Sequence, residues 1–288
     1  MHTKQIKEVF IDYLQTEDYT LEIKERFLGG MSNFTYHVIV NGTDYVVRIA
    51  NQTGREFVSY PGEKLHLHLV EPFLLTSKTL YYNLESGNKI AEYIPGENLA
   101  NSLNAHDLEN VARLLRELHA TKIEGIDYDL VGRFTRYEKL VDSLSPLYYE
   151  LKAFWLNEYK ATYAKIAKIF THGDVQRTNI IRGPRGYFLV DFEFAGMNDP
   201  FIDIAGFGNI DFNDALNLLP YYLKKPATDQ DYRRLYFYRM FQVLQWHLVA
   251  LYKHNIGQST ALQIDFEKYA NNYLNFAHEY REKIISLS

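Results

Sequence analysis

The sequence predicts an α+β chain with two parts, an N-terminal antiparallel sheet with a helix over residues 1–95 and a mainly helical part over residues 96–288. Three observations predict this division. Residues 20–50 are rich in β-branched and aromatic residues and contain Asn41-Gly42, a strong signal for a tight hairpin turn. In the second part, apolar residues recur at the three- and four-residue spacing of a buried helix face. Between the two parts, an extended segment ends in Pro95-Gly96, which suits a hinge.

Residue patterning in the first part predicts helices and strands in alternation. Ile6, Val9, Phe10, Tyr13 and Leu14 fall at helical spacing near the start of the chain. The glycines at 29–30 and the turn at 85–88 separate runs of strand-forming residues. The expected elements are a helix at 3–15, strands at 20–28, 34–41 and 43–50, a helix at 55–69, and strands at 73–83 and 88–94.

The second part is expected to be helical around one short hairpin. Leu108, Val111 and Leu115 form a stripe on a predicted helix. Pro200 suits the first position of another helix, in which Asp203 is placed to brace the loop before it. The expected elements are helices at 104–121, within 135–169, from 200 onward, at 229–254 and at 259–285, and a short strand at 180–182.

Composition limits the classes of function. Hydrophobic residues make up 47% and charged residues 23% of the chain, as in soluble globular proteins. The net charge of −5 argues against nucleic acid as the main partner and allows a cationic substrate. The chain has no cysteine, which excludes disulfides and a thiolate nucleophile, and no apolar run of 18 residues. We therefore expect a cytoplasmic protein without membrane insertion, whose 24 Tyr and 18 Phe could supply an aromatic pocket.

Asp174, Asn179 and Asp191 are the candidate catalytic residues. Asn179 follows Asp174 by five positions and Asp191 follows it by 17, the spacing of a kinase catalytic loop and its metal-binding strand. A carboxylate such as Asp174 can hold a substrate hydroxyl and accept its proton. Asn179 and Asp191 supply the hard oxygen ligands that Mg²⁺ prefers. The alternative is a pair of surface acids and a capping asparagine beside a hairpin.

A glycine-rich turn in the first hairpin could bind phosphate. Gly30 frees the backbone to fold over an anion, while backbone N–H groups and the hydroxyl of Ser32 can donate to it, with Asn33 beside them. A plain hairpin turn is the alternative. The strand pair that follows carries Arg48 near its end, where a kinase's third strand places its phosphate-binding cation.

Arg48 needs an acidic partner if it is to be held in place. A guanidinium offers a planar fork of donors for phosphate or carboxylate oxygens. Glu63, in the helix predicted next, is the expected partner, and Glu56 competes for this role. Further on, the strand that leads to the hinge exposes backbone groups suited to an adenine edge.

The order of these motifs resembles the choline/ethanolamine kinases, and most closely the bacterial choline kinases of the LicA type, within the aminoglycoside-phosphotransferase and protein-kinase-like superfamily. The resemblance runs from about residue 20 to residue 285. The matching motifs are Gly29-Gly30-Met31-Ser32-Asn33, Val47-Arg48-Ile49, His172-Gly173-Asp174 with Asn179, Asp191-Phe192-Glu193-Phe194, and Asn198-Asp199-Pro200 with Asp203-Ile204.

The resemblance implies a two-lobed protein-kinase-like fold that uses ATP and Mg²⁺. By this likeness Asp174 is the base, Asn179 and Asp191 are metal ligands, and Arg48 and Glu63 anchor phosphate. Glu92 to Ile94 would form the adenine hinge. The implied activity is phosphorylation of a small amino alcohol, first of all choline. Ethanolamine, thiamine or an aminoglycoside are alternative acceptors, and a catalytically dead nucleotide-binding scaffold is the alternative that is not an enzyme.

A quaternary ammonium acceptor would need a box of aromatic faces and an acid. Glu193 and Phe194 are candidates from the Asp-Phe-Glu-Phe motif, and Trp246 and Tyr252 match the family's closing-helix motif. Two positions depart from the family. Val249 stands where a second tryptophan is usual, and Ile210 stands where a glutamate is usual, which leaves Asp211 as the nearest acid.

Overall fold

The computed structural model describes residues 2–27 and 33–287, which pack as two compact units. The first unit comprises the residues up to Asn104 together with Arg177–Ala195. The second comprises Ala105–Gln176 and Gly196–Ser288. A boundary after residue 95, drawn between a nucleotide lobe and a catalytic lobe, stays a prediction. By packing, the first unit takes in a later segment of the chain, the one that carries Asn179 and Asp191.

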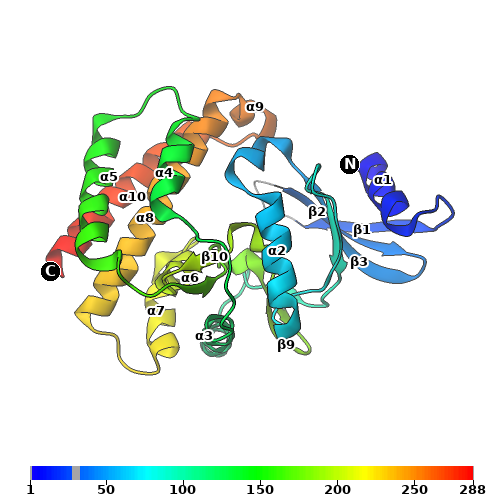
Figure 1. Cartoon of the computed structure of the whole chain (residues 1–288), viewed down its shortest axis with the longest axis horizontal. Helices are drawn as coiled ribbons and strands as arrows, with labels where there is room; N and C mark the ends of the chain where they lie inside the picture. The colour runs from blue at the N-terminus through cyan, green and yellow to red at the C-terminus, as the bar shows by residue number, and fades with distance from the viewer. Residues whose placement is uncertain (1, 28–32, 288) are drawn as a thin grey trace. The chain divides into compact units, whose positions relative to one another are not determined.

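An antiparallel sheet in the order β1-β2-β3-β5-β4 forms the centre of the first unit (Figure 1). The predicted turn between the second and third strands is confirmed. Asn41 and Gly42 have φ angles of 49° and 78°, and both central residues of this tight turn type need positive φ. The strands are β1 (Leu21–Phe27), β2 (Asn33–Val40), β3 (Thr43–Ala50), β4 (Thr79–Tyr82) and β5 (Lys89–Glu92).

Two predicted elements of the first unit begin later than expected. The strand predicted at 73–83 begins at Thr79, because Glu71–Phe73 is a 3-10 turn and Leu74 has a φ of 58°. The helix predicted from residue 55 is α2 (Tyr60–Val70), because Gln52–Phe57 forms a 3-10 turn instead. Ser59 caps this helix by accepting a hydrogen bond from the backbone N–H of Gly62 at 3.2 Å.

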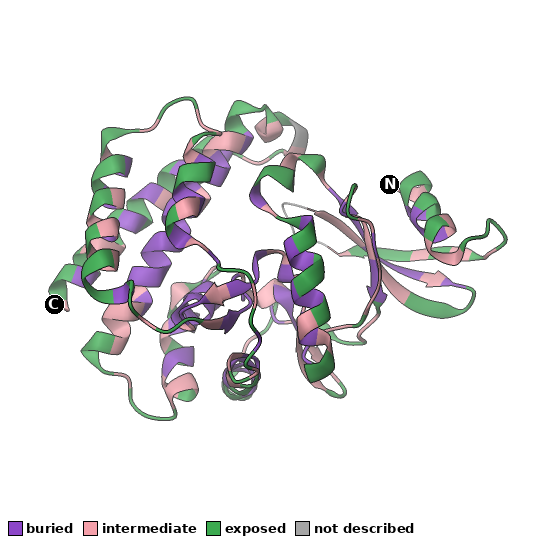
Figure 2. Cartoon of the chain, viewed as in Figure 1, coloured by how far each residue is buried: buried purple, intermediate pink, exposed green. Residues whose placement is uncertain are grey.

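Helix α1 (Thr3–Leu14) packs on the sheet through the residues that its periodicity predicts. Ile6, Val9 and Phe10 join one hydrophobic cluster with inward-facing strand residues such as Val38 and Val47. Figure 2 shows both buried and exposed positions along this helix. Burying each large apolar side chain contributes roughly 1.5–3 kcal/mol, which holds the helix to the sheet.

A smaller sheet in the order β6-β8-β9 completes the first unit. Its strands are β6 (Glu97–Asn98), β8 (Ile180–Gly183) and β9 (Gly186–Leu189). The predicted short strand at 180–182 is thus confirmed as part of a hairpin. Gly96 lies against β8 so closely that a Cβ atom there would be 2.4 Å from the carbonyl oxygen of Arg182. The pairing therefore requires glycine at this position.

The second unit is mainly helical, as predicted, and α8 (Asp229–Asn255) lies at its centre. Figure 2 shows α8 buried along most of its length. Trp155, on α5 (Pro146–Glu158), is fully buried and donates to the carbonyl oxygen of Phe237 on α8 at 3.1 Å. The other helices are α3 (Ala105–His119), α4 (Leu130–Glu138), α6 (Phe201–Phe207), α7 (Phe212–Leu223), α9 (Gln258–Leu262) and α10 (Phe266–Ser286).

One expectation for the second unit is wrong. The helix predicted at 259–285 is divided into α9 and α10, because Gln263 has a φ of 53° and Asp265 caps a new helix by accepting from the N–H of Lys268. Beside these helices, the short strands β7 (Ile169–Thr171) and β10 (Gly196–Asn198) pair antiparallel. Among the described residues, no helix combines the length and the apolar character needed to cross a bilayer.

Candidate active site

Arg48 on β3 and Glu63 on α2 form a buried, two-pronged ion pair in the first unit. Arg48 Nη1 donates to Glu63 Oε1 at 2.8 Å, and Nη2 donates to Oε2 at 2.7 Å. The two residues are 3% and 1% exposed. Parallel hydrogen bonds between a guanidinium and a carboxylate fix both orientation and distance. The structure thus brings together the predicted partners, whereas Glu56, the competing acid, lies exposed in a 3-10 turn.

Further groups hold this ion pair in position. Tyr82 donates from its hydroxyl to Glu63 Oε2 at 2.7 Å, and Lys89 donates to Oε1 at 2.8 Å. Burial alone would raise the pKa of Glu63, but Arg48 and Lys89 lower that pKa to about 2. Arg48 Nη2 also donates to the backbone carbonyl of Gly87 at 3.0 Å. Glu63 therefore stays ionised, and Arg48 has little freedom to move.

Two more carboxylates face the same guanidinium. Arg48 Nη1 donates to Asp191 Oδ1 at 3.3 Å, and it lies 3.8 Å from Glu193 Oε2, which accepts from Asn33 Nδ2 at 2.9 Å. Burial and the neighbouring Asp191 raise the pKa of Glu193, against the effect of Arg48. Glu63, Asp191 and Glu193 thus bring three carboxyl groups to one guanidinium. Such a surplus of acidic groups favours the binding of an added cation.

The hairpin β8-β9 places Asn179 and Asp191 at the same end. Ile180, the first residue of β8, pairs with Leu189, the last residue of β9. The N–H of Val190 then donates to the carbonyl oxygen of Asn179 at 2.9 Å. Asp191 follows with a φ of 68°, a left-handed conformation that Asn, Asp and Gly adopt most readily. The hairpin thus places the two predicted metal ligands, Asn179 and Asp191, at the same end.

Asn179 and Asp191 present the type of ligands that suit Mg²⁺. Across residues 2–27 and 33–287, no group of three or more His, Asp or Glu side chains is placed to hold a metal ion by itself. Mg²⁺ in nucleotide sites usually takes one or two protein oxygens, with the rest from phosphates and water. An amide oxygen and a carboxylate, the latter beside the acidic surplus around Arg48, fit this pattern. Their role as metal ligands stays a prediction.

The other predicted nucleotide contacts are Gly30, Ser32, Glu92 and Ile94. Gly30 and Ser32 lie outside the described residues. Glu92, at the end of β5, is exposed, and its N–H donates to the carbonyl oxygen of Lys78 at 3.0 Å. Ile94 follows in the segment that leads to β6 and is half-buried. The backbone N–H of Glu92 is therefore already engaged in the protein, and contact of this segment with an adenine edge stays a prediction.

In the second unit, two backbone hydrogen bonds hold the loop that carries Asp174. Asp203 on α6 is fully buried and accepts from the N–H of His172 at 2.8 Å and from that of Gly173 at 2.7 Å. Gly173 has a φ of 81°, where a side chain would be strained. The predicted bracing role of Asp203 is thereby confirmed. Asp174 itself is half-buried, and its Oδ2 accepts from Gln176 Nε2 at 3.0 Å.

His119 has a different role from the one its position in the sequence indicates. A histidine at the end of a helix is expected to act as a C-terminal cation. Instead, His119 Nε2 lies 3.0 Å from Asp203 Oδ2, and its Nδ1 lies 2.8 Å from the hydroxyl of Tyr222. His119 therefore orients the carboxylate that braces the loop. Helix spacing alone could not reveal this contact, because His119 and Asp203 are 84 residues apart.

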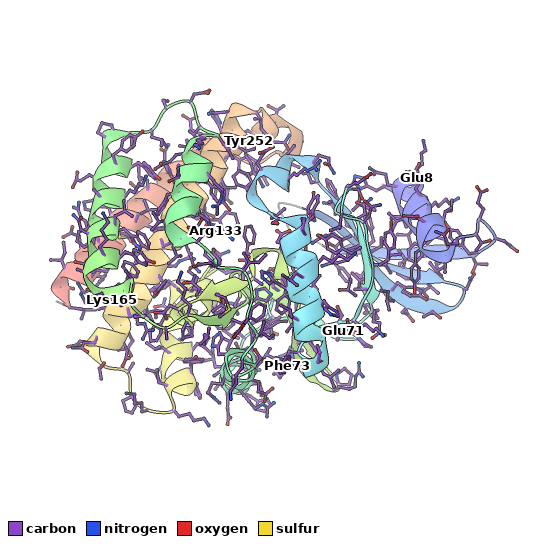
Figure 3. The ribbon with its side chains drawn as sticks, in the orientation of Figure 1. Glu8, Glu71, Phe73, Arg133, Lys165 and Tyr252 are labelled. Carbon is purple, nitrogen blue, oxygen red and sulfur yellow. The ribbon has the colours of Figure 1, made fainter. Side chains whose placement is uncertain are left out.

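The predicted acceptor-binding residues lie on several elements. Trp246 and Tyr252 are half-buried on α8, and Figure 3 labels Tyr252 toward the C-terminal end of this helix. Six residues of helix separate them by roughly 120° around the axis, so they project in different directions. Phe194 is buried beside Glu193 in the first unit. A common acceptor pocket lined by Phe194, Trp246 and Tyr252 stays a prediction.

The two departures from the family pattern have structural correlates. Val249 is 4% exposed in the core of the second unit, whereas Ile210 is 54% exposed. Asp211 is exposed and caps α7, where it accepts from the N–H of Asn213 at 3.0 Å. Its carboxylate therefore already has a structural task, and a role in acceptor binding stays a prediction.

Three polar residues near Asp174 were not found from the sequence. Gln176 donates a hydrogen bond to the carboxylate of Asp174. Tyr128 is buried, which raises its pKa to about 12 with a smaller contribution from Asp174. Tyr273, on α10, has a raised pKa from burial, with a small contribution from Asp174. The high tyrosine content was the only sequence signal for the two tyrosines, and no spacing pattern distinguishes them from core residues.

Comparisons with known proteins identify relatives of this chain. A sequence profile of the phosphotransferase enzyme family (APH) matches residues 25–238. Protein LicA of Haemophilus influenzae is 23% identical over 277 residues, which cover 89% of this chain and 79% of that protein. Choline kinase LicA from Streptococcus pneumoniae has a similar structure, with a TM-score of 0.79, 23% identity and coverage of 98% and 99% of the two chains.

A choline/ethanolamine kinase family protein from Mesorhizobium loti is similar as well. The TM-score is 0.80 and the identity 19%, and the match covers 100% of this chain and 99% of the other. At such low identities, the likeness establishes the fold. The predicted protein-kinase-like fold, with an antiparallel sheet in its N-terminal part and a mainly helical C-terminal part, is thereby confirmed.

Proposed function

The chain belongs to the phosphotransferase enzyme family, and from this premise we propose that it is an ATP- and Mg²⁺-dependent kinase that phosphorylates the hydroxyl of a small amino alcohol, with choline as the first candidate. The observation that carries the proposal is the clamp on Arg48. Glu63 holds this guanidinium in two places, and Asp191, a candidate metal ligand, accepts from the same Nη1 atom. A fixed cation beside a metal ligand suits the binding of adjacent phosphate groups.

Arg48 retains a donor for a ligand. Its Nε–H is buried and has no hydrogen-bond partner among the described residues, while both Nη atoms donate to protein groups. A buried donor without a partner carries a free-energy cost of about 1–3 kcal/mol. A phosphate oxygen of ATP would relieve this cost. We therefore assign Arg48 Nε–H to phosphate binding.

The chemical step mainly requires that the acceptor hydroxyl be aligned with the γ-phosphate and that the charge on the phosphate oxygens be neutralised. Asp174 would orient the acceptor hydroxyl toward the γ-phosphate and accept its proton as the new O–P bond forms. The bond between the γ-phosphorus and the β–γ bridging oxygen breaks at the same time, and ADP leaves. Asp203 maintains the position of the loop through two backbone amides, and Gln176 fixes one oxygen of Asp174. Asn179 and Asp191 would hold Mg²⁺, which when bound neutralises charge on the phosphate oxygens.

The choice of an amino alcohol rests on aromatic residues and acids. A cationic head group gains roughly 0.5–2 kcal/mol from each well-placed aromatic face. Phe194, Trp246 and Tyr252 are the proposed aromatic contacts, with Glu193 and Asp211 as the proposed acids. The similarity to choline kinase LicA supports choline, while Val249 and Ile210 leave ethanolamine or thiamine open. An aminoglycoside, as a polycation, would call for more acids and fewer aromatic residues.

An ADP-release screen tests the proposal. The purified protein would be given ATP and Mg²⁺ with choline, ethanolamine, thiamine or an aminoglycoside, and the Asp174→Ala variant would serve as the blank. Turnover with choline, detected as ADP and phosphocholine, is expected. Turnover with the aminoglycoside alone would overturn the amino-alcohol assignment. Binding of ATP without turnover on any acceptor would favour a nucleotide-binding scaffold instead.

A further inference from the structure

A chain of side-chain hydrogen bonds runs from a buried arginine to Asp174 within the second unit. Arg239 Nη2 donates to Asn209 Oδ1 at 3.3 Å. Asn209 Nδ2 donates to Gln176 Oε1 at 3.1 Å, and Gln176 Nε2 donates to Asp174 Oδ2 at 3.0 Å. The four residues come from α8, the turn after α6 and the loop that contains Asp174. We call this chain the Arg239 relay.

The direction of the relay is fixed at both of its ends. A guanidinium only donates hydrogen bonds, and an ionised carboxylate only accepts them. The amide of Asn209 must therefore turn its oxygen toward Arg239 and its nitrogen toward Gln176. The same constraint turns the nitrogen of Gln176 toward Asp174. If either amide were reversed, two acceptors or two donors would face each other.

Arg239 is itself well suited to anchor such a chain. It is 4% exposed, and its Nη1 donates to Gln242 Oε1 at 3.2 Å, while Gln242 Nε2 donates to the backbone carbonyl of Ile202 at 2.8 Å. Its side chain also forms a hydrogen bond with Tyr280. Within the described part of the chain, no carboxylate lies at salt-bridge distance from Arg239. A buried cation normally has an acidic partner, so neutral amides around it are unusual.

From this geometry we infer that Arg239 and Asn209 are positioning residues for the phosphotransfer proposed above, which impose on Gln176 the orientation that donates to Asp174. The donated hydrogen bond limits rotation of the Asp174 carboxylate, and so sets the direction in which its oxygens meet the acceptor hydroxyl. Alignment of this kind contributes to the rate of the chemical step and little to the binding of either substrate.

The replacement Asn209→Asp tests the relay, because it exchanges one NH₂ group for an oxygen. The introduced carboxylate would still accept from Arg239, and the pair gains a buried charge interaction, so the melting temperature is expected to stay the same or to rise. The carboxylate cannot donate to Gln176, whose amide would then turn its nitrogen toward position 209 and its oxygen toward Asp174. We expect kcat to fall roughly 10- to 100-fold, as for the loss of a hydrogen bond to a charged group, with the KM for ATP unchanged.

A double-mutant cycle separates the relay from an effect of charge alone. In a Gln176→Met background there is no amide to reverse, so Asn209→Asp is expected to change kcat less than twofold. Asn217→Asp adds the same charge on the exposed side of α7 and is expected to leave kcat unchanged. A folded Asn209→Asp enzyme with wild-type kcat would overturn the inference. The inference would also fail if the kcat decrease were equally large in the Gln176→Met background.

The test does not depend on choline being the acceptor. It is run with whichever alcohol supports turnover, and the slow hydrolysis of ATP by water gives a second measurement of the same loop. If choline is not phosphorylated but another alcohol is, the acceptor assignment fails while the relay is still tested. If the alcohol is phosphorylated and Asn209→Asp has no effect, only the relay fails.

Discussion

Glu63 accepts two parallel hydrogen bonds from Arg48 in a region where both side chains are almost completely buried. The second unit has no matching pair around Arg239, whose hydrogen-bond acceptors among the described residues are neutral. An ion pair of the Arg48 kind is costly to break, because the remaining charge stays buried without compensation. The position of the Arg48 guanidinium therefore depends on the carboxylate of Glu63.

The replacement Glu63→Gln is expected to lower the free energy of unfolding by about 3 kcal/mol, since Arg48 and Lys89 would keep their charges beside a neutral amide. The KM for ATP should rise, because Arg48 would lose its two-pronged support. Glu56→Gln is the matched control and should be nearly neutral, since Glu56 is exposed. Denaturant unfolding and ATP titration measure the two effects. Equal results for both variants would show that Glu63 does not anchor Arg48.

Gly87 should tolerate substitution less well than Gly42, although their φ angles are 76° and 78°. A Cβ atom at Gly87 would lie 2.3 Å from Cζ of Tyr60, whereas nothing lies within 4 Å of one at Gly42. Gly42→Ala should cost about 1 kcal/mol from backbone strain alone. Gly87→Ala should cost about 1–3 kcal/mol more, from the overpacking.

The difference is measured by thermal unfolding of the two variants side by side. Because the carbonyl of Gly87 accepts from Arg48, Gly87→Ala should also raise the KM for ATP, while Gly42→Ala should not. Equal stability of the two variants would mean that the ring of Tyr60 moves aside without cost.

His66 should make the stability of the protein depend on pH on the acidic side. Burial lowers the pKa of His66 to about 4, from an ordinary value of 6.5, with Glu63 opposing this shift. Between these two values the unfolded chain binds a proton that the folded protein does not, so the free energy of unfolding falls as the pH decreases from 6.5 to 4. The expected loss is on the order of 3 kcal/mol.

The variant His66→Gln should show a flatter pH dependence over this window, measured by urea unfolding at several pH values. His68, two residues further along α2, is exposed, and His68→Gln should keep the wild-type slope. If His66→Gln and His68→Gln behaved alike, another group would be responsible for the acid sensitivity.

The base is tested by Asp174→Ala, which should reduce kcat by at least about 10²-fold, as for the loss of a positioned proton acceptor. ATP–Mg²⁺ binding, measured by calorimetric titration, should remain close to that of the wild type, since Arg48, Asn179 and Asp191 are unchanged. An Asp174→Ala enzyme that retained full activity would assign the base elsewhere.

Trp246→Ala should raise the KM for the amino alcohol roughly tenfold and leave the KM for ATP nearly unchanged, because a cation–π contact is worth about 1–2 kcal/mol. Trp246→Phe keeps an aromatic face and should recover much of the loss. Steady-state kinetics with each substrate varied in turn measures both constants. A similar rise in both KM values would argue for a packing role of Trp246.

Some parts of the candidate site depend only on local sequence patterns, and these parts could be predicted from the sequence. Asp174, Asn179 and Asp191 stand at fixed spacing, and the strand position of Arg48 points to a helical acid such as Glu63. The contacts of Arg239 and His119 could not be predicted, because each joins residues that are far apart in the sequence. Asp211 shows a third case, in which an acid expected to bind a ligand caps a helix.

The fold, too, could be predicted only where local residues specify the backbone conformation. Asn41 and Gly42 predict their turn, since few other residues adopt its backbone angles. The break between α9 and α10 occurs at Gln263, in a left-handed conformation without any glycine or proline to signal it. Helical periodicity continues on both sides, so the sequence favours one long helix there.

The first unit is assembled from two separated stretches of chain, and this affects its synthesis. β6 finds its partner β8 only after residue 183 has been made, and the hairpin with Asn179 and Asp191 belongs to Arg177–Ala195. A nascent chain leaves the ribosome from its N-terminus, at about 5–20 residues per second. β6 therefore stays without its partner strand for several seconds, the time needed to make the residues up to 183.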